Sequence, residues 1–298
     1  MNDTVETTVI GSYPVSLNTL KMMDDYTNGV LPSWNPYIKH AVSSMSDAGI
    51  DLISDGQTRD PFINIFARGF QGCRIRSRAE VIGPVDLVKS ITKNDLAYVS
   101  SIIPKDKKIL GLLVGPCTLS ESVVDYYYND KKELAFAFAN ALKKELKIIE
   151  PLVDMISIDE PFFSNSFPEY AKELISMVLD GISCPTRMHV CGDVSSIVPE
   201  LLDMPADILS HEFKASPKIF DSFKEHESIK KICLGSVRSD DKRVESIDEI
   251  ADHIKKGIEV FGERIIQLSP DCGLRMMPRD SAFEKLKNLV KAGDMVYG

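Results

Sequence analysis

A histidine and a cysteine two residues apart form a pattern that could bind a metal. They are His189 and Cys191, in the stretch Met188-His189-Val190-Cys191-Gly192. Residues two apart in an extended strand project to the same face, so the imidazole and the thiol are expected to lie side by side. Imidazole and thiolate are ligands that suit Zn²⁺. The alternative interpretation is a half-buried strand that carries both residues by chance.

Two further residues have the right chemistry to complete such a site. Cys272 stands between Pro270-Asp271 and Gly273, and Glu212 follows the apolar pair Ile208-Leu209. A structural zinc site is closed by four strong protein ligands, whereas a catalytic site keeps one position for exchange. A carboxylate as the fourth ligand would leave room for such exchange. We therefore predict a Zn²⁺ site formed by His189, Cys191, Glu212 and Cys272.

The composition is that of an ordinary globular protein. The chain has 298 residues, of which 44% are hydrophobic and 27% are charged, and no apolar run approaches the ~18 residues of a membrane span. The net charge of −9 argues against a nucleic-acid surface. The first residues lack the basic and apolar regions of a signal peptide, so we expect a cytoplasmic protein without a membrane or nucleic-acid partner. The six cysteines are scattered, and we expect thiols or metal ligands rather than disulfides.

The elements that must position these residues alternate between strand and helix. Short apolar or β-branched runs predict strands, and apolar residues at helical spacing predict the helices between them. The predicted strands are residues 6–10, 50–54, 108–114, 155–158, 186–191, 207–210, 231–235 and 265–268. The predicted helices are residues 38–48, 131–149, 168–179, 195–202, 246–261 and 281–291. Residues 73–76 and 79–82 are expected to pair as a hairpin inserted after the second strand.

Eight strands alternating with helices predict an α/β fold, a single (β/α)8 TIM barrel over residues 1–298. The polar residues of interest all fall at or just after the end of a predicted strand. Active sites of these barrels lie at the C-terminal face of the strands, where such residues converge. The expected group at this face is Ser12, Gln57, Asp159, His189, Cys191, Glu212 and Cys272.

The remaining histidines receive simpler interpretations. His40 and His253 lie in predicted helices and His226 in an acidic stretch, so all three are expected at the surface. His211, beside Glu212, is expected to be structural, with a supporting role for the metal site as the alternative.

Four motifs together resemble the catalytic C-terminal barrel of the cobalamin-independent methionine synthase family, in the short single-domain form known from archaea and bacteria. They are Ile10-Gly11-Ser12-Tyr13-Pro14, Ile158-Asp159-Glu160-Pro161, His189-Val190-Cys191 and Ser269-Pro270-Asp271-Cys272-Gly273-Leu274. The resemblance covers essentially the whole chain. It implies a zinc enzyme that methylates the thiol of L-homocysteine to give L-methionine, with the same four metal ligands.

The resemblance also implies an amino acid pocket. The backbone of Ile10, Gly11 and Ser12 would receive the carboxylate of homocysteine, and Asp159 would receive its ammonium group. Gln57 stands where the family has a glutamate that also holds the ammonium. That contact is expected to be weaker here.

Three departures from the family concern the methyl donor. Asp240 stands where the family has a proton-donating histidine, and the tryptophan that stacks on the pterin is missing near Ser122. The folate-binding N-terminal half of the long enzymes also has no counterpart. Methyl transfer from a folate amine needs a protonated nitrogen, whereas loss of Co(I) from methylcobalamin does not. We therefore expect a methylated corrinoid donor, methylcobalamin or a corrinoid protein, with Asp240 as a catalytic residue of the altered site.

Two other functions remain open at this point. His189-Val190-Cys191-Gly192 with a distant Cys272 also resembles the methylcobalamin:coenzyme M methyltransferases, although a sulfonate gains nothing from Asp159. A zinc-binding protein without catalytic activity is the second alternative.

Overall fold

The structure is a computed structural model that describes residues 5–15, 24, 25, 27–29, 34–59 and 61–298. Residues 1–4, which carried part of the signal-peptide prediction, lie outside the described residues. Within the described ranges, no helix has both the length and the apolar character needed to cross a membrane.

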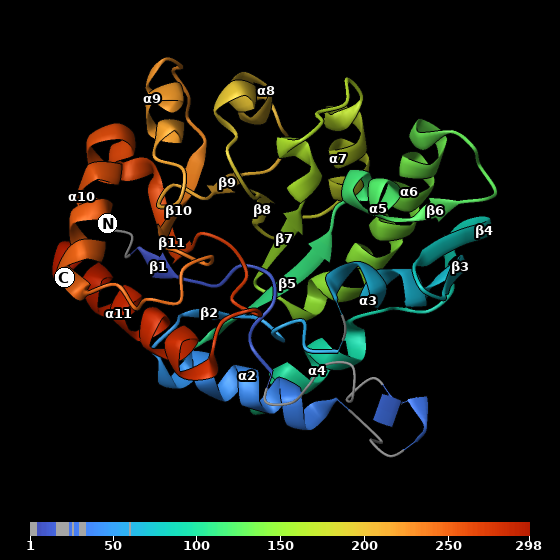
Figure 1. Ribbon diagram of the computed structural model, residues 1–298, viewed down its shortest axis with the longest axis horizontal. Coiled ribbons are helices and arrows are strands. Elements are labelled where there is room, and N and C mark those ends of the chain that lie inside the picture. The colour runs from blue at the N-terminus through green and yellow to red at the C-terminus, as the bar shows by residue number, and fades with distance from the viewer. Residues whose placement is uncertain (1–4, 16–23, 26, 30–33, 60) are drawn as a thin grey trace.

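Among the described residues, eight parallel strands form one sheet that curls into a nearly closed barrel (Figure 1). Their order around the sheet is β1-β11-β10-β9-β8-β7-β5-β2. An isolated parallel bridge between Thr8 and Leu52 connects the two ends of this order, so the circle is nearly closed. The strands are β1 (Glu6–Thr7), β2 (Leu52–Ile53), β5 (Lys108–Val114), β7 (Met155–Asp159), β8 (Thr186–Val190), β9 (Ile208–His211), β10 (Lys231–Val237) and β11 (Ile265–Pro270).

Helices surround the strands, as Figure 1 shows. They are α2 (Asn35–Asp47), α3 (Phe62–Gly69), α4 (Lys93–Ile102), α5 (Pro116–Ser122), α6 (Lys131–Ile149), α7 (Ala171–Leu179), α8 (Val198–Leu202), α9 (Lys218–Lys224), α10 (Ile247–Phe261) and α11 (Arg279–Tyr297). Short 3-10 turns are η1 (Glu150–Leu152), η2 (Pro161–Ser164), η3 (Ser195–Ile197) and η4 (Gly262–Arg264). The predicted barrel is therefore confirmed.

The predicted hairpin is also confirmed, as a small sheet beside α3 and α6. It consists of β3 (Phe70–Ile75), β4 (Ala79–Leu87) and β6 (Val124–Asp125). β3 and β4 pair antiparallel, with Cys73 opposite Val81. Figure 1 places this sheet at the edge of the molecule, outside the ring of helices.

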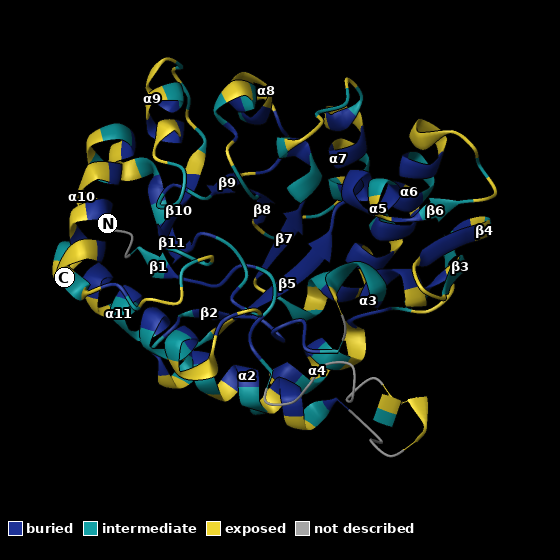
Figure 2. Ribbon diagram, in the orientation of Figure 1, coloured by how far each residue is buried: buried dark blue, intermediate teal, exposed yellow. Residues whose placement is uncertain are grey.

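The two faces of each barrel strand differ in character. Figure 2 shows the strands buried and the outer helix surfaces exposed. Along β7 and β8, Ile156, Ile158, Met188 and Val190 are almost completely buried. Side chains alternate along a strand, so these apolar residues face the helices while the intervening polar ones face the barrel interior. Buried polar side chains therefore gather inside the barrel.

Several helix predictions need correction. α3, α4, α5 and α9 were not predicted, and none of them begins with a side-chain cap that marks its start. Residues 195–202 form η3 and then α8 rather than one helix. The prediction at α10 is confirmed in detail, because Ser246 and Glu249 form a reciprocal capping box.

His253 on α10 corrects the expectation of a surface residue. Only 8% of its surface is exposed, and its Nε2 lies 2.9 Å from the backbone oxygen of Gly235. Burial lowers the pKa of this imidazole to about 4. The helical pattern identified α10 correctly, but not the face of α10 on which His253 packs.

Candidate metal centre and amino acid pocket

Three predicted metal ligands come together where β8 and β11 end. Nε2 of His189 lies 3.1 Å from Sγ of Cys191, which in turn lies 2.7 Å from Sγ of Cys272. The three potential ligand atoms lie within 4.8 Å of one another, and both cysteines are free thiols. The same-face rule predicted the first pair, and the barrel brings Cys272 to it from 81 residues further along the chain.

The imidazole of His189 is oriented by a contact at its other nitrogen. Nδ1 lies 3.0 Å from Oγ of Ser210 on the neighbouring strand β9. When Nδ1 donates to this hydroxyl, the lone pair of Nε2 faces the thiols. The pKa of His189 lies well below its ordinary value, first because of burial and then because of the positive charges of His211 and Arg187. A neutral imidazole is the form that binds metals.

Asp271 fixes the loop that carries Cys272. Its backbone N–H donates to the carbonyl of Val237 at 2.8 Å, and its carboxylate accepts from the N–H groups of Lys214 and Ala215. Burial raises the pKa of this carboxyl to about 8. A Cβ at Gly235 would lie only 2.4 Å from Asp271 Oδ1. Glycine is therefore required there for the loop to approach β10.

Glu212, the predicted fourth ligand, lies beside this cluster but outside the compact group of three. It follows β9 directly and is half-buried. Burial raises its pKa, while the N–H of Gly192 and the thiol of Cys272 lower it. The carboxyl group is thus a neighbour of Cys272, and its role as a ligand stays a prediction.

The predicted amino acid pocket is assembled around Gly11. A Cβ at this position would lie 3.8 Å from Oδ2 of Asp159, 3.8 Å from Oε1 of Gln57 and 3.9 Å from Cα of Gly273. The backbone of Gly11 has a φ of +49°, a conformation that glycine adopts readily. Two side-chain oxygens and the residue after Cys272 therefore meet at the loop that follows β1.

Gln57 is held in an unusual backbone conformation, with a φ of 44°. Its N–H donates to Oδ1 of Asp55 at 3.0 Å, and its carbonyl accepts from Nη1 of Arg275 at 2.8 Å. A non-glycine residue at positive φ costs free energy and persists only where its surroundings fix it. Asp55 and Arg275 supply that restraint, and the sequence pattern did not identify either of them.

Asp159 and Glu160 are adjacent but point to different partners. Oδ1 of Asp159 accepts from Oγ of Ser157 at 3.0 Å, whereas Glu160 accepts from the N–H groups of Cys117 and Thr118 at the start of α5. Burial raises the pKa of Asp159 to about 6, against the opposing effects of Arg187 and Ser157. Asp159 is therefore the carboxylate available to the pocket.

Asp240 lies on the exposed loop after β10. Its two carboxylate oxygens accept from Nε and Nη2 of Arg238 at 2.8 and 2.7 Å. This pairing holds the pKa of Asp240 below its ordinary value. The negative charge of Asp240 raises the pKa of Glu212, whereas Arg238 lowers it, so the loop lies near the candidate metal ligands. An ionised carboxylate cannot replace the proton donor that the resemblance expects at this position.

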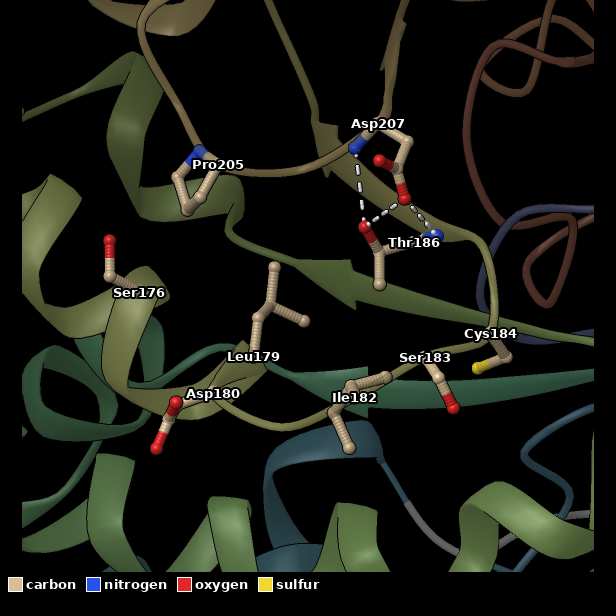
Figure 3. Close-up of a pocket in the computed structure, with 9 residues that line it drawn as sticks. All are labelled: Ser176, Leu179, Asp180, Ile182, Ser183, Cys184, Thr186, Pro205 and Asp207. Atoms are coloured by element: carbon tan, nitrogen blue, oxygen red, sulfur yellow. Dashed lines mark hydrogen bonds between the residues drawn. The ribbon is translucent and has the colours of Figure 1, made fainter.

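A cavity lies at the end of the barrel opposite the candidate site (Figure 3). It has a volume of about 320 Å³ and is lined by residues of α7 and of the starts of β8 and β9. Thr186 and Asp207 hydrogen-bond to each other at its wall. Because β8 begins at Thr186 and ends near His189, this cavity is separated from the metal ligands by the length of the strand.

The chain matches the family model described as cobalamin-independent synthase, catalytic domain, over residues 5–295. The methionine synthase of Methanocaldococcus jannaschii is 36% identical, over 97% of this chain and 99% of that protein. That of Methanothermobacter marburgensis is 32% identical, over 96% and 98%. In fold, the chain resembles a B12-independent methionine synthase from Shewanella sp. W3-18-1, solved with selenomethionine, at a TM-score of 0.83, 22% identity and coverage of 98% and 97%.

These matches overturn the prediction of the methyl donor. The family that covers the chain is by its description independent of cobalamin, so methylcobalamin, a corrinoid protein partner and the methylcobalamin:coenzyme M alternative are wrong. The prediction relied on the absence of three family features, namely the tryptophan near Ser122, the histidine at position 240 and the folate-binding N-terminal half. The absence of features that bind one donor does not identify another donor. The resemblance itself is confirmed over the full length of the barrel. The chain belongs to the cobalamin-independent synthase family and carries its catalytic domain in residues 5–295.

Proposed function

We propose that this protein is a zinc-dependent methyltransferase that methylates the thiol of L-homocysteine and releases L-methionine. The observation that carries the proposal is the adjacency of Cys272 and Gly273. Cys272 belongs to the thiol and imidazole cluster, and Gly273 lies against Gly11 at the amino acid pocket. One small amino acid can therefore reach the metal with its thiol while its amino end lies at Gly11.

The residues fit zinc by the chemistry of their donor atoms. Two thiols and one neutral imidazole converge, and a half-buried carboxyl group lies beside them. Soft sulfur and imidazole ligands favour Zn²⁺ over Mg²⁺ or Ca²⁺. His189, Cys191 and Cys272 would hold the ion, with Glu212 as the fourth ligand. When bound, zinc acts as a Lewis acid that deprotonates a coordinated thiol and orients its sulfur.

The chain's own residues bind and orient the substrate. The buried carboxylate of Asp159 receives the ammonium group, because burial strengthens an interaction between opposite charges. Gln57 adds a neutral amide oxygen on the same side of Gly11. The backbone of Ile10, Gly11 and Ser12 receives the carboxylate. These contacts hold the sulfur in one position, and such positioning accounts for a large part of the rate of a bimolecular transfer.

Asp240 is proposed to act electrostatically at the mouth of the site. Its pairing with Arg238 keeps the loop charges balanced beside Glu212. A proton donor for the leaving group is not assigned to it, because its lowered pKa keeps it ionised at neutral pH.

The test uses a methylating agent that needs no binding site for a natural donor. Zinc-loaded protein is mixed with L-homocysteine and methyl iodide, and L-methionine is measured by mass spectrometry. We expect methionine to form faster with the protein than from free homocysteine at the same pH. We also expect X-ray absorption at the zinc edge to detect one additional sulfur neighbour of zinc when homocysteine is added. A protein that binds zinc but neither gains this sulfur nor accelerates alkylation would be a non-catalytic zinc protein.

A further inference from the structure

A positively charged side chain lies in the centre of the barrel, below the pocket. Arg187 on β8 is completely buried. Its guanidinium contacts residues of three other strands and the segment after β1. The acceptors are Oγ of Ser157 at 3.2 Å, Oγ1 of Thr8 at 3.5 Å, Sγ of Cys233 at 3.6 Å, Oε1 of Gln267 at 3.4 Å and the carbonyl of Val9 at 2.9 Å.

Every one of these partners is uncharged. Across the described residues, no acidic side chain forms an ion pair with Arg187 within 4.0 Å. A buried charge without a counter-charge is costly, so a merely structural position would favour an apolar residue. The cost becomes understandable if the charge acts on a nearby anion.

Ser157 links Arg187 to such an anion. Its hydroxyl oxygen accepts from Nε of Arg187 and donates to Oδ1 of Asp159. Arg187 and Ser157 are direct neighbours on paired strands, as are Asp159 and His189. Among the groups acting on Asp159, the charge of Arg187 is the strongest that opposes the effect of burial on its pKa.

The two oxygens of Asp159 are therefore differently occupied. Oδ1 is held from below by Ser157, while Oδ2 faces the loop at Gly11 together with Oε1 of Gln57. A carboxyl group can turn about its last bond unless one oxygen is fixed. Fixing Oδ1 leaves Oδ2 in one place at the pocket.

We propose that Arg187 is a positioning residue that, through Ser157, holds Asp159 with Oδ2 directed into the pocket, so that the site selects thiols that carry an ammonium group. The proposal rests on the proposed function and adds to it the origin of substrate selectivity. Ammonium recognition then depends on a chain of three residues, only one of which touches the substrate.

The test compares two ligands that differ in the ammonium group alone. L-homocysteine and 4-mercaptobutyrate share the thiol, the carbon chain and the carboxylate. Their dissociation constants are measured by calorimetry on zinc-loaded wild type, Ser157→Ala, Arg187→Met and Arg187→Lys. Cys233→Ala is the matched control, because Cys233 is equally buried and contacts a different nitrogen, Nη1, of the same guanidinium.

We expect Ser157→Ala to weaken homocysteine binding about 10-fold, the size expected for one hydrogen bond to a charged group, and to change 4-mercaptobutyrate binding by less than about 2-fold. Arg187→Met should reduce the preference for homocysteine over 4-mercaptobutyrate more than Ser157→Ala does. Arg187→Lys should regain part of that preference, because it restores the positive charge. Zinc content should equal that of wild type. Cys233→Ala should leave the ratio of the two affinities unchanged.

Equal losses for both ligands, or the same shift in ratio with Cys233→Ala, would overturn the proposal. Ser157→Ala removes only a hydroxyl group, so the test stands even if Arg187→Met fails to fold. A wild type that binds neither thiol would refute the proposed function itself. A wild type that prefers homocysteine, with a ratio that Ser157→Ala leaves unchanged, would refute only the role of Arg187.

Discussion

Replacing Lys285 by methionine should strongly destabilise the protein. Lys285 on α11 and Glu245 in the loop before α10 form an ion pair at 2.6 Å, and their side chains are 0% and 1% exposed. The other oxygen of Glu245 accepts from the N–H of Arg238 at 2.8 Å, and its carbonyl accepts from Nδ2 of Asn288. The pair thus fastens the loop that carries Asp240 to the last helix.

The expected magnitude follows from what the substitution leaves behind. Lys285→Met keeps most of the buried volume but leaves the carboxylate of Glu245 with one backbone N–H as its remaining partner. Removing one member of a buried ion pair costs about 3–5 kcal/mol, a large share of the ~5–15 kcal/mol that stabilises a typical domain. The double variant Lys285→Met with Glu245→Gln should lose less than the single one, because no charge remains buried and an acceptor for Arg238 is kept.

Urea unfolding followed by circular dichroism measures these free energies. Lys287→Met on the same helix is the matched control, since Lys287 is partly exposed and its ammonium group lies near Glu284 and over the ring of Phe283. This control should change stability by less than about 1 kcal/mol. A Lys285→Met variant as stable as Lys287→Met, or a double variant less stable than the single one, would contradict the reasoning.

Three further predictions concern the site and its surroundings. Cys191→Ser should lose most of the bound zinc measured by metal analysis, whereas Cys184→Ser, outside the cluster, should keep it; equal zinc in both would remove the assignment. Asp159→Asn should weaken homocysteine binding about 10- to 150-fold by calorimetry, the value of a charge-assisted contact, with zinc retained; lost zinc with unchanged affinity would place Asp159 at the metal instead. Because the pKa of His253 is lowered in the folded protein, this histidine binds a proton more readily in the unfolded chain as the pH falls. The contribution of neutral His253 to the free energy of unfolding is therefore complete above pH 6.5 and is lost as the pH falls towards 4. Between pH 7 and pH 4 the wild type should therefore lose about 3 kcal/mol more unfolding free energy than His253→Gln, with His226→Gln as control; parallel curves would contradict the low pKa.

The elements predicted most accurately are those whose bounds are set by residues within or next to the element. Residues 108–114 were predicted as a strand and form β5 with the same bounds, because the apolar run is continuous and Gly115-Pro116 ends it. The capping box at Ser246 is equally local. By contrast, β1 and β2 contain only two residues each, and their length is decided by hydrogen bonds to distant strands. No local pattern encodes that.

The candidate metal ligands stand out in the sequence, whereas the residues that support them do not. His189 and Cys191 carry typical metal-binding groups, and their spacing of two residues places both side chains on the same face of a strand. Ser157 and Arg187 follow the same alternation, two residues before Asp159 and His189, but serine and arginine are common and their partners lie on other strands. The spacing of Ser157 and Arg187 is visible in the sequence. Their contacts with each other and with Asp159 depend on the register in which the barrel strands pair.

That register is what holds the chemistry in place. β7 pairs with β8 so that Ser157 lies opposite Arg187 and Asp159 opposite His189, and β8 pairs with β9 so that His189 lies opposite Ser210. Shifting either strand by one residue would turn the polar row out to the helices and bring the apolar row inward. The buried Ile158 and Met188 oppose that shift, because they would leave their contacts with the helices. The apolar outer face of the barrel thus fixes the positions of the polar residues inside it.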